Sequence, residues 1–131
     1  MPSIFTRIAQ REIPGHFVAE NDEFFAILDI NPLKRGHVLV IPKTEVDHLF
    51  DLSPEILTRY FQFTQRVGKA IKSTVPCERI GMSVIGLEVP HAHIHLIPIN
   101  VMDDMNFSRP KLSFTNEELA ETAEAIKAAF I

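Results

Sequence analysis

The stretch PHAHIHLIPI, residues 90–99, places a histidine at every second position of an otherwise apolar run. Alternate side chains of a β-strand share one face, so His91, His93 and His95 would stand in a row about 6.6 Å apart. The residues between them would face the opposite way, into a core: Ala92, Ile94 and Leu96. The proline at residue 90 indicates a strand edge or a bulge just before the row. The sequence therefore predicts a strand over residues 90–99 with three imidazoles on one face.

Such a row of imidazoles has three uses. A hydrogen-bonded polar face is the least favoured, because histidine is a poor strand former and every buried imidazole needs a partner. A metal site is chemically suitable, since a His-x-His pair on a strand can bind zinc or iron. The third use is attack on phosphorus by one neutral imidazole, while its neighbours orient it and donate protons to phosphate oxygens. The residue types alone do not separate the last two.

The rest of the chain predicts a mixed fold. Short β-prone runs bounded by turn residues predict strands at 16–20, 23–30, 37–42 and 79–85, the middle two forming an antiparallel pair. Helix starts are marked by Ser3, by Ser53 with a following proline, and by Thr115 with Glu118. They predict a short helix from residue 4 and longer helices over 54–72 and 116–130. These elements indicate one α+β domain over residues 1–131, with no clear periodicity at 100–113.

Composition limits the class of partner. The 131 residues carry a net charge of −4 and no dense run of Lys or Arg, so a nucleic-acid groove is not expected. The single cysteine, Cys77, permits no internal disulfide and no multi-cysteine metal site. Charged residues follow the apolar start too soon for a signal peptide, and no apolar run approaches the roughly 20 residues that span a bilayer. No membrane partner is expected, and the cytoplasm is the expected location.

The alternating histidines form the motif HAHIHLI at residues 91–97, and matching blocks lie upstream. These blocks are Ile4-Phe5 with Ile8, Glu12-Ile13-Pro14, residues 25–30 with Asp29, and GHVLVIPK at residues 36–43. In this order the chain resembles the histidine triad (HIT) family of nucleotide hydrolases and transferases, in its Hint-like branch, over most of residues 3–98. The resemblance implies a HIT-like α+β fold, a five-stranded antiparallel sheet with two main helices. It also implies a homodimer that joins two sheets through the long helix and an edge strand.

The same resemblance assigns roles to individual side chains. His93 occupies the position of the nucleophile that forms a nucleotidyl-histidine intermediate. His91 and His95 correspond to the flanking histidines that contact phosphate oxygens and the leaving group, and His37 to a fourth histidine that orients the nucleophile. Asp29 would accept hydrogen bonds from the ribose hydroxyls. The alternative is that Asp29 caps the turn before Asn31-Pro32. The purine would lie among apolar side chains, each of which, taken singly, is more often plain core: Ile4, Phe5, Ile8, Ile27, Leu28 and Ile30.

Two departures from the family pattern bear on the site. Where many bacterial relatives have zinc-binding cysteines and a histidine, this chain has Ser3, Thr6 and Glu45, and His48 is shifted by three residues. Such a set is too poor for tight structural zinc, so zinc is not expected.

The second departure lies just before the histidines, at residues 86–89, where the resemblance implies that Glu88 and Val89 contact the nucleotide. The family usually has Gly-Gln-Ser-Val there, and this chain has Gly86-Leu87-Glu88-Val89, with no asparagine several residues earlier. A carboxylate at Glu88 disfavours an anion unless it points away or is protonated. Alternatively, Glu88 selects a cationic or amine leaving group.

The expected function is a nucleotide phosphoramidase or hydrolase that cleaves at a purine nucleoside monophosphoryl group. The chemistry in principle needs no metal, although Mg²⁺ can accompany polyphosphate substrates. Three alternatives stay open: a nucleotide-binding or scaffolding homodimer with little or no activity, a dinucleoside polyphosphate hydrolase, and a metal-dependent hydrolase that uses the three histidines as ligands. The leaving group, the base and the pathway are not determined by the sequence.

Overall fold

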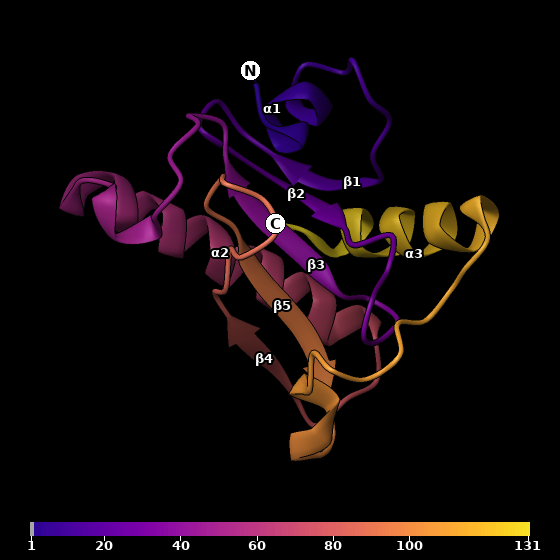
Figure 1. Ribbon diagram of the computed structural model, residues 1–131. Coiled ribbons are helices and arrows are strands. Elements are labelled where there is room, and N and C mark those ends of the chain that lie inside the picture. Colours follow the sequence, from indigo (N-terminus) through magenta and orange to yellow (C-terminus); the bar gives the residue numbers. More distant parts are fainter. Residues whose placement is uncertain (1) are drawn as a thin grey trace.

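The computed structural model describes residues 2–131 and contains a five-stranded antiparallel sheet with flanking helices (Figure 1). The strands are β1 (Phe17–Glu20), β2 (Phe24–Leu28), β3 (Val38–Pro42), β4 (Arg79–Ser83) and β5 (Ile94–Ile99). The helices are α1 (Ile4–Ala9), α2 (Pro54–Thr74) and α3 (Asn116–Ala129), with 3₁₀ turns η1 (Leu49–Asp51) and η2 (Met102–Met105). The expected α+β fold with two main helices is confirmed.

The strands lie in the order β1-β2-β3-β5-β4, and every neighbouring pair is antiparallel. The predicted pairing of β2 with β3 is confirmed, with Phe24 opposite Pro42 and Leu28 opposite Val38. Most predicted strands differ from the observed ones by one or two residues at their ends. β5 lies between β3 and β4, so the strand that continues from the histidines is an interior strand.

The strand predicted over residues 90–99 begins only at Ile94, so this prediction is wrong at its amino-terminal end. Pro90 has no N–H to donate, and the next N–H, that of His91, bonds to the carbonyl of Val89. The Ala92 N–H then bonds to Val46, beyond the end of β3. Residues 91–93 are therefore held by the turns around β3 rather than by the sheet ladder, although their side chains still alternate between two sides.

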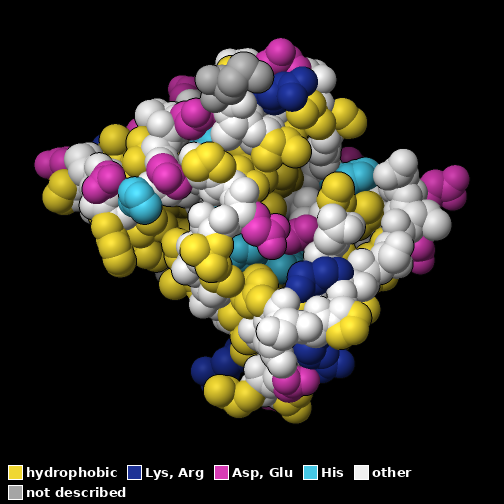
Figure 2. All heavy atoms as spheres, in the orientation of Figure 1, with side chains coloured by type: hydrophobic (Ala, Val, Ile, Leu, Met, Phe, Trp, Pro, Cys, Tyr) yellow, Lys and Arg dark blue, Asp and Glu magenta, His cyan; other side chains and the backbone are white. Residues whose placement is uncertain are grey.

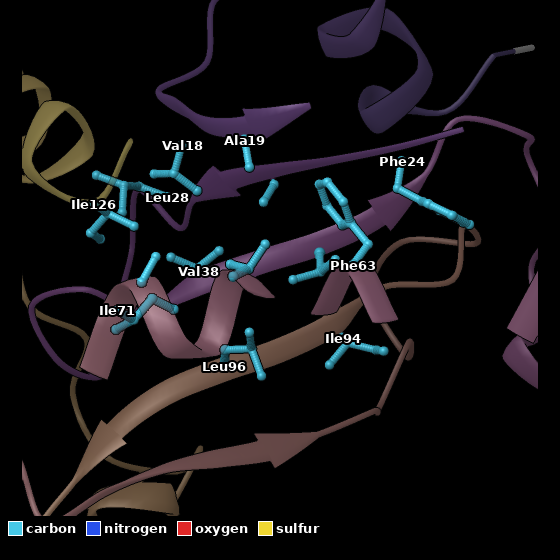
Figure 3. Close-up of a cluster of buried hydrophobic side chains, with 14 of the residues drawn as sticks. Val18, Ala19, Phe24, Leu28, Val38, Phe63, Ile71, Ile94, Leu96 and Ile126 are labelled. Carbon is cyan, nitrogen blue, oxygen red and sulfur yellow. The ribbon is translucent and has the colours of Figure 1, made fainter. Parts of the chain in front are cut away.

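The larger core lies between the sheet and α2 and α3 (Figure 3). Its sheet members are alternate residues, among them Phe24, Leu28, Val38, Ile94 and Leu96. Ala92 joins the same cluster, so the prediction that the residues between the histidines enter a core is confirmed. A smaller cluster, on the opposite face, packs α1 against the sheet through Phe5, Ile8, Phe25, Ile27, Leu39 and Ile41. Because both faces are covered, β2 and β3 are buried along their whole length.

The helices begin where the sequence predicts. Ser3 and Ser53 accept hydrogen bonds from backbone N–H groups in the first turns of α1 and α2. Thr115 and Glu118 form the predicted capping box of α3. No helix within residues 2–131 is long and apolar enough to cross a bilayer.

Residues 100–113, which show no periodicity, fold back along the sheet. The carboxylate of Asp104 accepts hydrogen bonds from the N–H groups of Asn100 and Val101, which fixes η2 directly after β5. Further on, the N–H of Leu112 bonds to the carbonyl of Pro32, in the connection between β2 and β3. The segment therefore lies beside the loop that carries Asp29 and His37.

Candidate active site

Four histidines gather on the α1 side of the sheet. His91, His93, His95 and His37 are all buried, with exposed fractions of 0%, 6%, 9% and 1%. The ring of His95 lies between those of His93 and His37, with its centroid 5.0 Å from that of His93 and 5.2 Å from that of His37. Figure 2 shows histidine side chains near the middle of this face, beside acidic side chains and with a basic side chain close by.

A tight turn brings His37 behind the row. Gly36 has φ +88°, and a β-carbon there would lie 2.8 Å from Cγ2 of Val75, so a side chain would be strained in conformation and crowded. The N–H of His37 bonds to the carbonyl of Lys34, and its carbonyl accepts from the N–H of Asp29. These bonds place His37 and Asp29 side by side at the start of β3 and the end of β2.

The tautomers of His37 and His95 follow from one backbone group. The N–H of Leu33 donates to Nδ1 of His37 at 3.1 Å, so this nitrogen carries no proton. Burial, followed by the charges of His95 and Lys111, lowers the pKa of His37 to about 3, so the ring is neutral and the proton is on Nε2. That N–H donates to Nδ1 of His95 at 2.9 Å. Burial, and then the charge of His93, lowers the pKa of His95 to about 4, which leaves His95 neutral with an N–H at Nε2.

His93 has the opposite tautomer. Its Nδ1 lies 2.8 Å from the carbonyl oxygen of His91, which can only accept, so Nδ1 carries the proton. The Nε2 of His93 then presents a lone pair. The row therefore places a nucleophilic nitrogen, on His93, beside a hydrogen-bond donor, on His95.

His91 differs from both, because its two ring nitrogens are bonded within the protein. Nε2 donates to the carbonyl of Pro42 at 2.7 Å, and Nδ1 accepts from the hydroxyl of Ser3 at 2.6 Å. Burial lowers the pKa of His91, in opposition to the bond to Pro42 and the charge of Glu45. In this arrangement neither nitrogen is free for a phosphate oxygen, in contrast to the role that the family resemblance implies for His91.

The two carboxylate oxygens of Asp29 have different surroundings, and one of them makes the turn cap that the sequence suggests. One carboxylate oxygen accepts from the N–H of Asn31 at 2.9 Å and caps the turn. The other lies 3.7 Å from Nε2 of His37, and 21% of the side chain is exposed. Burial raises the pKa of Asp29, an effect to which Glu88 adds and which the Asn31 bond, His93 and Lys111 oppose. The second oxygen remains available to a ligand hydroxyl.

The apolar residues expected around a purine divide into three groups. Phe5, Ile8 and Ile27 belong to the smaller cluster, and Val89 packs against it. Ile4 and Ile30 are exposed, by 47% and 62%, and can contact a ligand. Leu28 points to the other face and into the larger core, because it is one residue out of phase with Ile27. The expectation that Leu28 lines a purine pocket is therefore wrong.

Two site residues come from a segment that the sequence left unassigned. The ring of Phe107 packs edge-on against His95, with centroids 5.0 Å apart, and against His37 at 6.3 Å. The ammonium group of Lys111 donates to the carbonyl of Phe107 at 2.6 Å and is close enough to influence the pKa of Asp29 and His37. A single aromatic residue in the polar run NFSRPKLS is the only signal that could have indicated this contact.

Glu88 lies on an exposed turn between β4 and the histidines, next to Leu87, which is 90% exposed. Its charge contributes to the raised pKa of Asp29, so the two carboxylates are close enough to interact electrostatically.

A metal does not fit the donors of the histidine cluster. Within residues 2–131, Asp29, His37 and His95 offer ligand atoms within 4.8 Å of one another. However, the Leu33 N–H fixes the proton of His37 on Nε2, the nitrogen that faces the other two groups. A protonated nitrogen has no lone pair for a metal. His37 and His95 instead form a hydrogen-bonded pair, named here the relay, with Asp29 beside it.

Comparison with known proteins identifies the family. The model of the HIT domain matches residues 10–101. The chain belongs to the HIT family. The protein named "Protein hit" from Bacillus subtilis is 33% identical over an alignment of 102 positions, which covers 72% of this chain and 69% of that protein. Adenosine 5′-monophosphoramidase HNT1 from Saccharomyces cerevisiae is 38% identical over 96 residues, 72% of this chain and 61% of its own length.

Solved HIT structures share the whole fold. A Hit-like protein from Bartonella henselae, involved in cell-cycle regulation, aligns with a TM-score of 0.82 and 31% identity over 97% of this chain and 95% of that one. A zinc-bound histidine triad family protein from Mycobacterium smegmatis aligns with a TM-score of 0.78 and 26% identity over 97% and 91% of the two chains.

The residues that the family resemblance places at zinc-binding positions bond to one another in this chain. Ser3 contacts His91, and Thr6 donates to Glu45 at 2.7 Å. Two neutral hydroxyls, one carboxylate and one imidazole form a poor donor set for zinc, which prefers thiolate and imidazole. His48 is 77% exposed and pairs with Asp47. The residues present do not fit a structural zinc ion.

Proposed function

We propose that this HIT protein is a nucleotide phosphoramidase or hydrolase that acts on a purine nucleoside monophosphoryl group through a nucleotidyl-histidine intermediate. The observation that carries the proposal is the bond from Nδ1 of His93 to the carbonyl of His91. It directs the lone pair of Nε2 outward, and it stabilises the positive charge that the ring gains when Nε2 bonds to phosphorus. The named activity of the yeast relative, an adenosine 5′-monophosphoramidase, supports the same reaction class.

The reaction proceeds in two displacements. Nε2 of His93 attacks phosphorus, the P–N or P–O bond to the leaving group breaks, and the departing atom takes up one proton. The neutral His95 supplies an N–H to a phosphoryl oxygen or to the leaving group, and His37 holds it in that tautomer. Water then attacks phosphorus, the bond to His93 breaks, and water releases one proton. The products are a nucleoside monophosphate and the free amine or alcohol.

Nucleotide binding uses the two sides of the histidine row. We assign the free carboxylate oxygen of Asp29 to the ribose hydroxyls, because it lies beside the relay and is still accessible. The purine would lie against Ile4, Ile30 and Val89, with Phe5, Ile8 and Ile27 behind them. The chemistry requires no metal on this chain, and Mg²⁺ would enter only with a polyphosphate substrate.

A homodimer is part of the proposal. β4 is an outer strand of the sheet, and apolar side chains are exposed on and just after it: Met82 by 53%, Val84 by 49% and Ile85 by 42%. Phe61 of the long helix α2 is also exposed, by 44%. An uncovered edge strand with apolar neighbours is suited to pairing with a second copy, which would extend the sheet across a two-fold axis.

The test is a single-turnover reaction with an adenosine 5′-phosphoramidate that carries a fluorescent amine, in the presence of a chelator. We expect wild-type protein to release the amine, and His93→Ala and His93→Gly to be slower by at least about 10³-fold, because both lack the nucleophile. Intact activity of the variants would contradict the proposal. Binding of AMP without turnover of phosphoramidate or dinucleoside polyphosphate would instead identify a nucleotide-binding protein.

A further inference from the structure

We propose that Ser3, Thr6 and Glu45, named here the Ser3–Thr6–Glu45 network, position the nucleophile His93 for catalysis. The inference rests on the proposed function, because it assigns a role in the same reaction to three residues that do not touch the reacting atoms. The network joins three parts of the chain: the first turn of α1, the turn after β3, and the residues that precede β5.

The hydrogen bonds of the network connect the buried ring of His91 to the exposed carboxylate of Glu45. The hydroxyl of Ser3 donates to Nδ1 of His91 at 2.6 Å and accepts from the N–H of Thr6 at 3.0 Å. The hydroxyl of Thr6 and the N–H of Ser3 both donate to one oxygen of Glu45, each at 2.7 Å. Two short bonds to a carboxylate are charge-assisted and therefore stronger than bonds between neutral groups.

The network controls the peptide group that fixes the tautomer of His93. The carbonyl of His91 accepts from Nδ1 of His93, and the N–H of the same peptide group, from Ala92, donates to Val46 at 2.7 Å. Val46 directly follows Glu45. Glu45 thus holds the ring of His91 through Ser3, while its neighbour holds the peptide group that follows His91. If either contact is lost, the carbonyl can rotate away from His93.

A second contact acts through α1. Phe5, which lies between Ser3 and Thr6 in sequence, packs edge-on against His91 and His93, with ring centroids 5.7 Å and 4.9 Å away. The side chain of Phe5 is 6% exposed, so it restricts the ring of His93 from the side of α1. Because Glu45 ties α1 to the turn after β3, it also fixes where Phe5 stands.

The variants separate this role from simple helix capping. Ser3→Ala removes the bond to His91, and Thr6→Val removes the bond to Glu45 with almost no change in shape. Ser3→Thr keeps the hydroxyl and is the rescue variant. Ser53→Ala, which removes the matching N-cap of α2, and Glu118→Gln, which alters the capping box of α3, are controls distant from the histidines.

Two readouts are measured on each variant: kcat and KM for the fluorescent phosphoramidate in chelator, and the tautomer of His93 from long-range ¹H–¹⁵N spectra of the imidazoles. We expect Ser3→Ala and Thr6→Val to lower kcat about 10-fold while KM changes less than about 3-fold, because a misplaced nucleophile affects the chemical step. His93 should also lose its single Nδ1–H tautomer. Ser3→Thr and both controls should stay within about 2-fold of wild type.

Unchanged kcat together with an unchanged His93 tautomer in Ser3→Ala and Thr6→Val would overturn the inference. A rise in KM alone would also overturn it, because the network would then only hold α1 against the ligand. If wild-type protein shows no turnover, the proposed function fails by itself, and the imidazole spectra still decide whether the network fixes His93.

Discussion

The two faces of the sheet are built from the same strands but have different contents. The face toward α2 and α3 is covered by a large cluster of aliphatic and aromatic residues, whereas the face toward α1 has a small cluster next to four buried imidazoles. Ile94 and His95, neighbours in sequence, belong to opposite faces. One face therefore supplies most of the folding free energy, and the other can hold four imidazoles because each of them makes at least one hydrogen bond within the protein.

The largest expected difference between the faces comes from His93→Asn. The asparagine amide keeps an N–H donor for the carbonyl of His91 but has no nucleophilic nitrogen. We expect turnover to fall by at least about 10³-fold, while the free energy of unfolding stays within about 1 kcal/mol of wild type. Phosphoramidate kinetics and urea denaturation measure the two effects. A large loss of stability would show that side chains on the α1 face also contribute substantially to the free energy of unfolding.

Ile94→Ala makes the opposite test. Ile94 is fully buried in the larger cluster, so its truncation should lower the free energy of unfolding by about 2–5 kcal/mol. Activity per folded molecule should remain close to wild type, since the side chain faces away from the histidines. Urea denaturation, with activity measured well below the transition, checks both values. A proportional loss of activity would argue that the faces are coupled.

The buried imidazoles should make stability depend on pH. His37 and His95 have pKa values of about 3 and about 4 in the folded protein, whereas histidine in an unfolded chain has a pKa of about 6.5. Between these values the unfolded state binds more protons. The stabilisation is therefore complete above about pH 6.5 and is lost progressively as pH falls toward 4, by about 1.4 kcal/mol per pH unit for each group.

Urea denaturation at pH 7.5, 6.5, 5.5 and 4.5 measures this slope. His95→Asn should make this slope shallower, because it removes one of the two buried imidazoles. Equal stability at pH 7.5 and 5.5 would contradict the neutral, buried state of the relay.

The smallest expected effect concerns the rim of the site. Glu88 is exposed and its charge acts on Asp29, so Glu88→Gln should lower the preference for amine over neutral leaving groups by only about 3-fold, as for a screened surface charge. Competition between two adenosine 5′-phosphoryl substrates, a phosphoramidate with an amine leaving group and a phosphate ester with a neutral leaving group, measures this preference. Glu121→Gln, on the exposed side of α3, is the matched control. An unchanged preference would remove Glu88 from leaving-group selection.

Local signals in the sequence predicted the fold well. The alternation of residues 91–96 places Ala92, Ile94 and Leu96 in the core, and Ser53 and Thr115 mark the starts of the main helices, because these features depend on neighbours within a few residues. The start of β5 was predicted wrongly, since the partner of Ala92 is Val46, which no local pattern indicates.

The site was predicted less completely, because its hydrogen bonds join distant segments. The histidines and Asp29 could be singled out, but the bonds that fix their protons come from Leu33, Pro42 and Ser3. Phe107 reaches the relay from a segment without periodicity. A backbone N–H or carbonyl has no signature in the sequence, so tautomers were beyond what the pattern could predict.

The position of His93 relative to the sheet has a mechanical consequence. The first residue of β5 is Ile94, paired with Val40, so His93 lies one residue outside the hydrogen-bonded ladder. Residues 91–93 therefore owe their position to side chains and turns outside the sheet, among them Ser3, Pro42 and Val46, whereas β5 is held by interstrand bonds to two neighbours. The segment with His93 and the strand with His95 thus derive their rigidity from different parts of the protein, and the two meet at a single peptide bond.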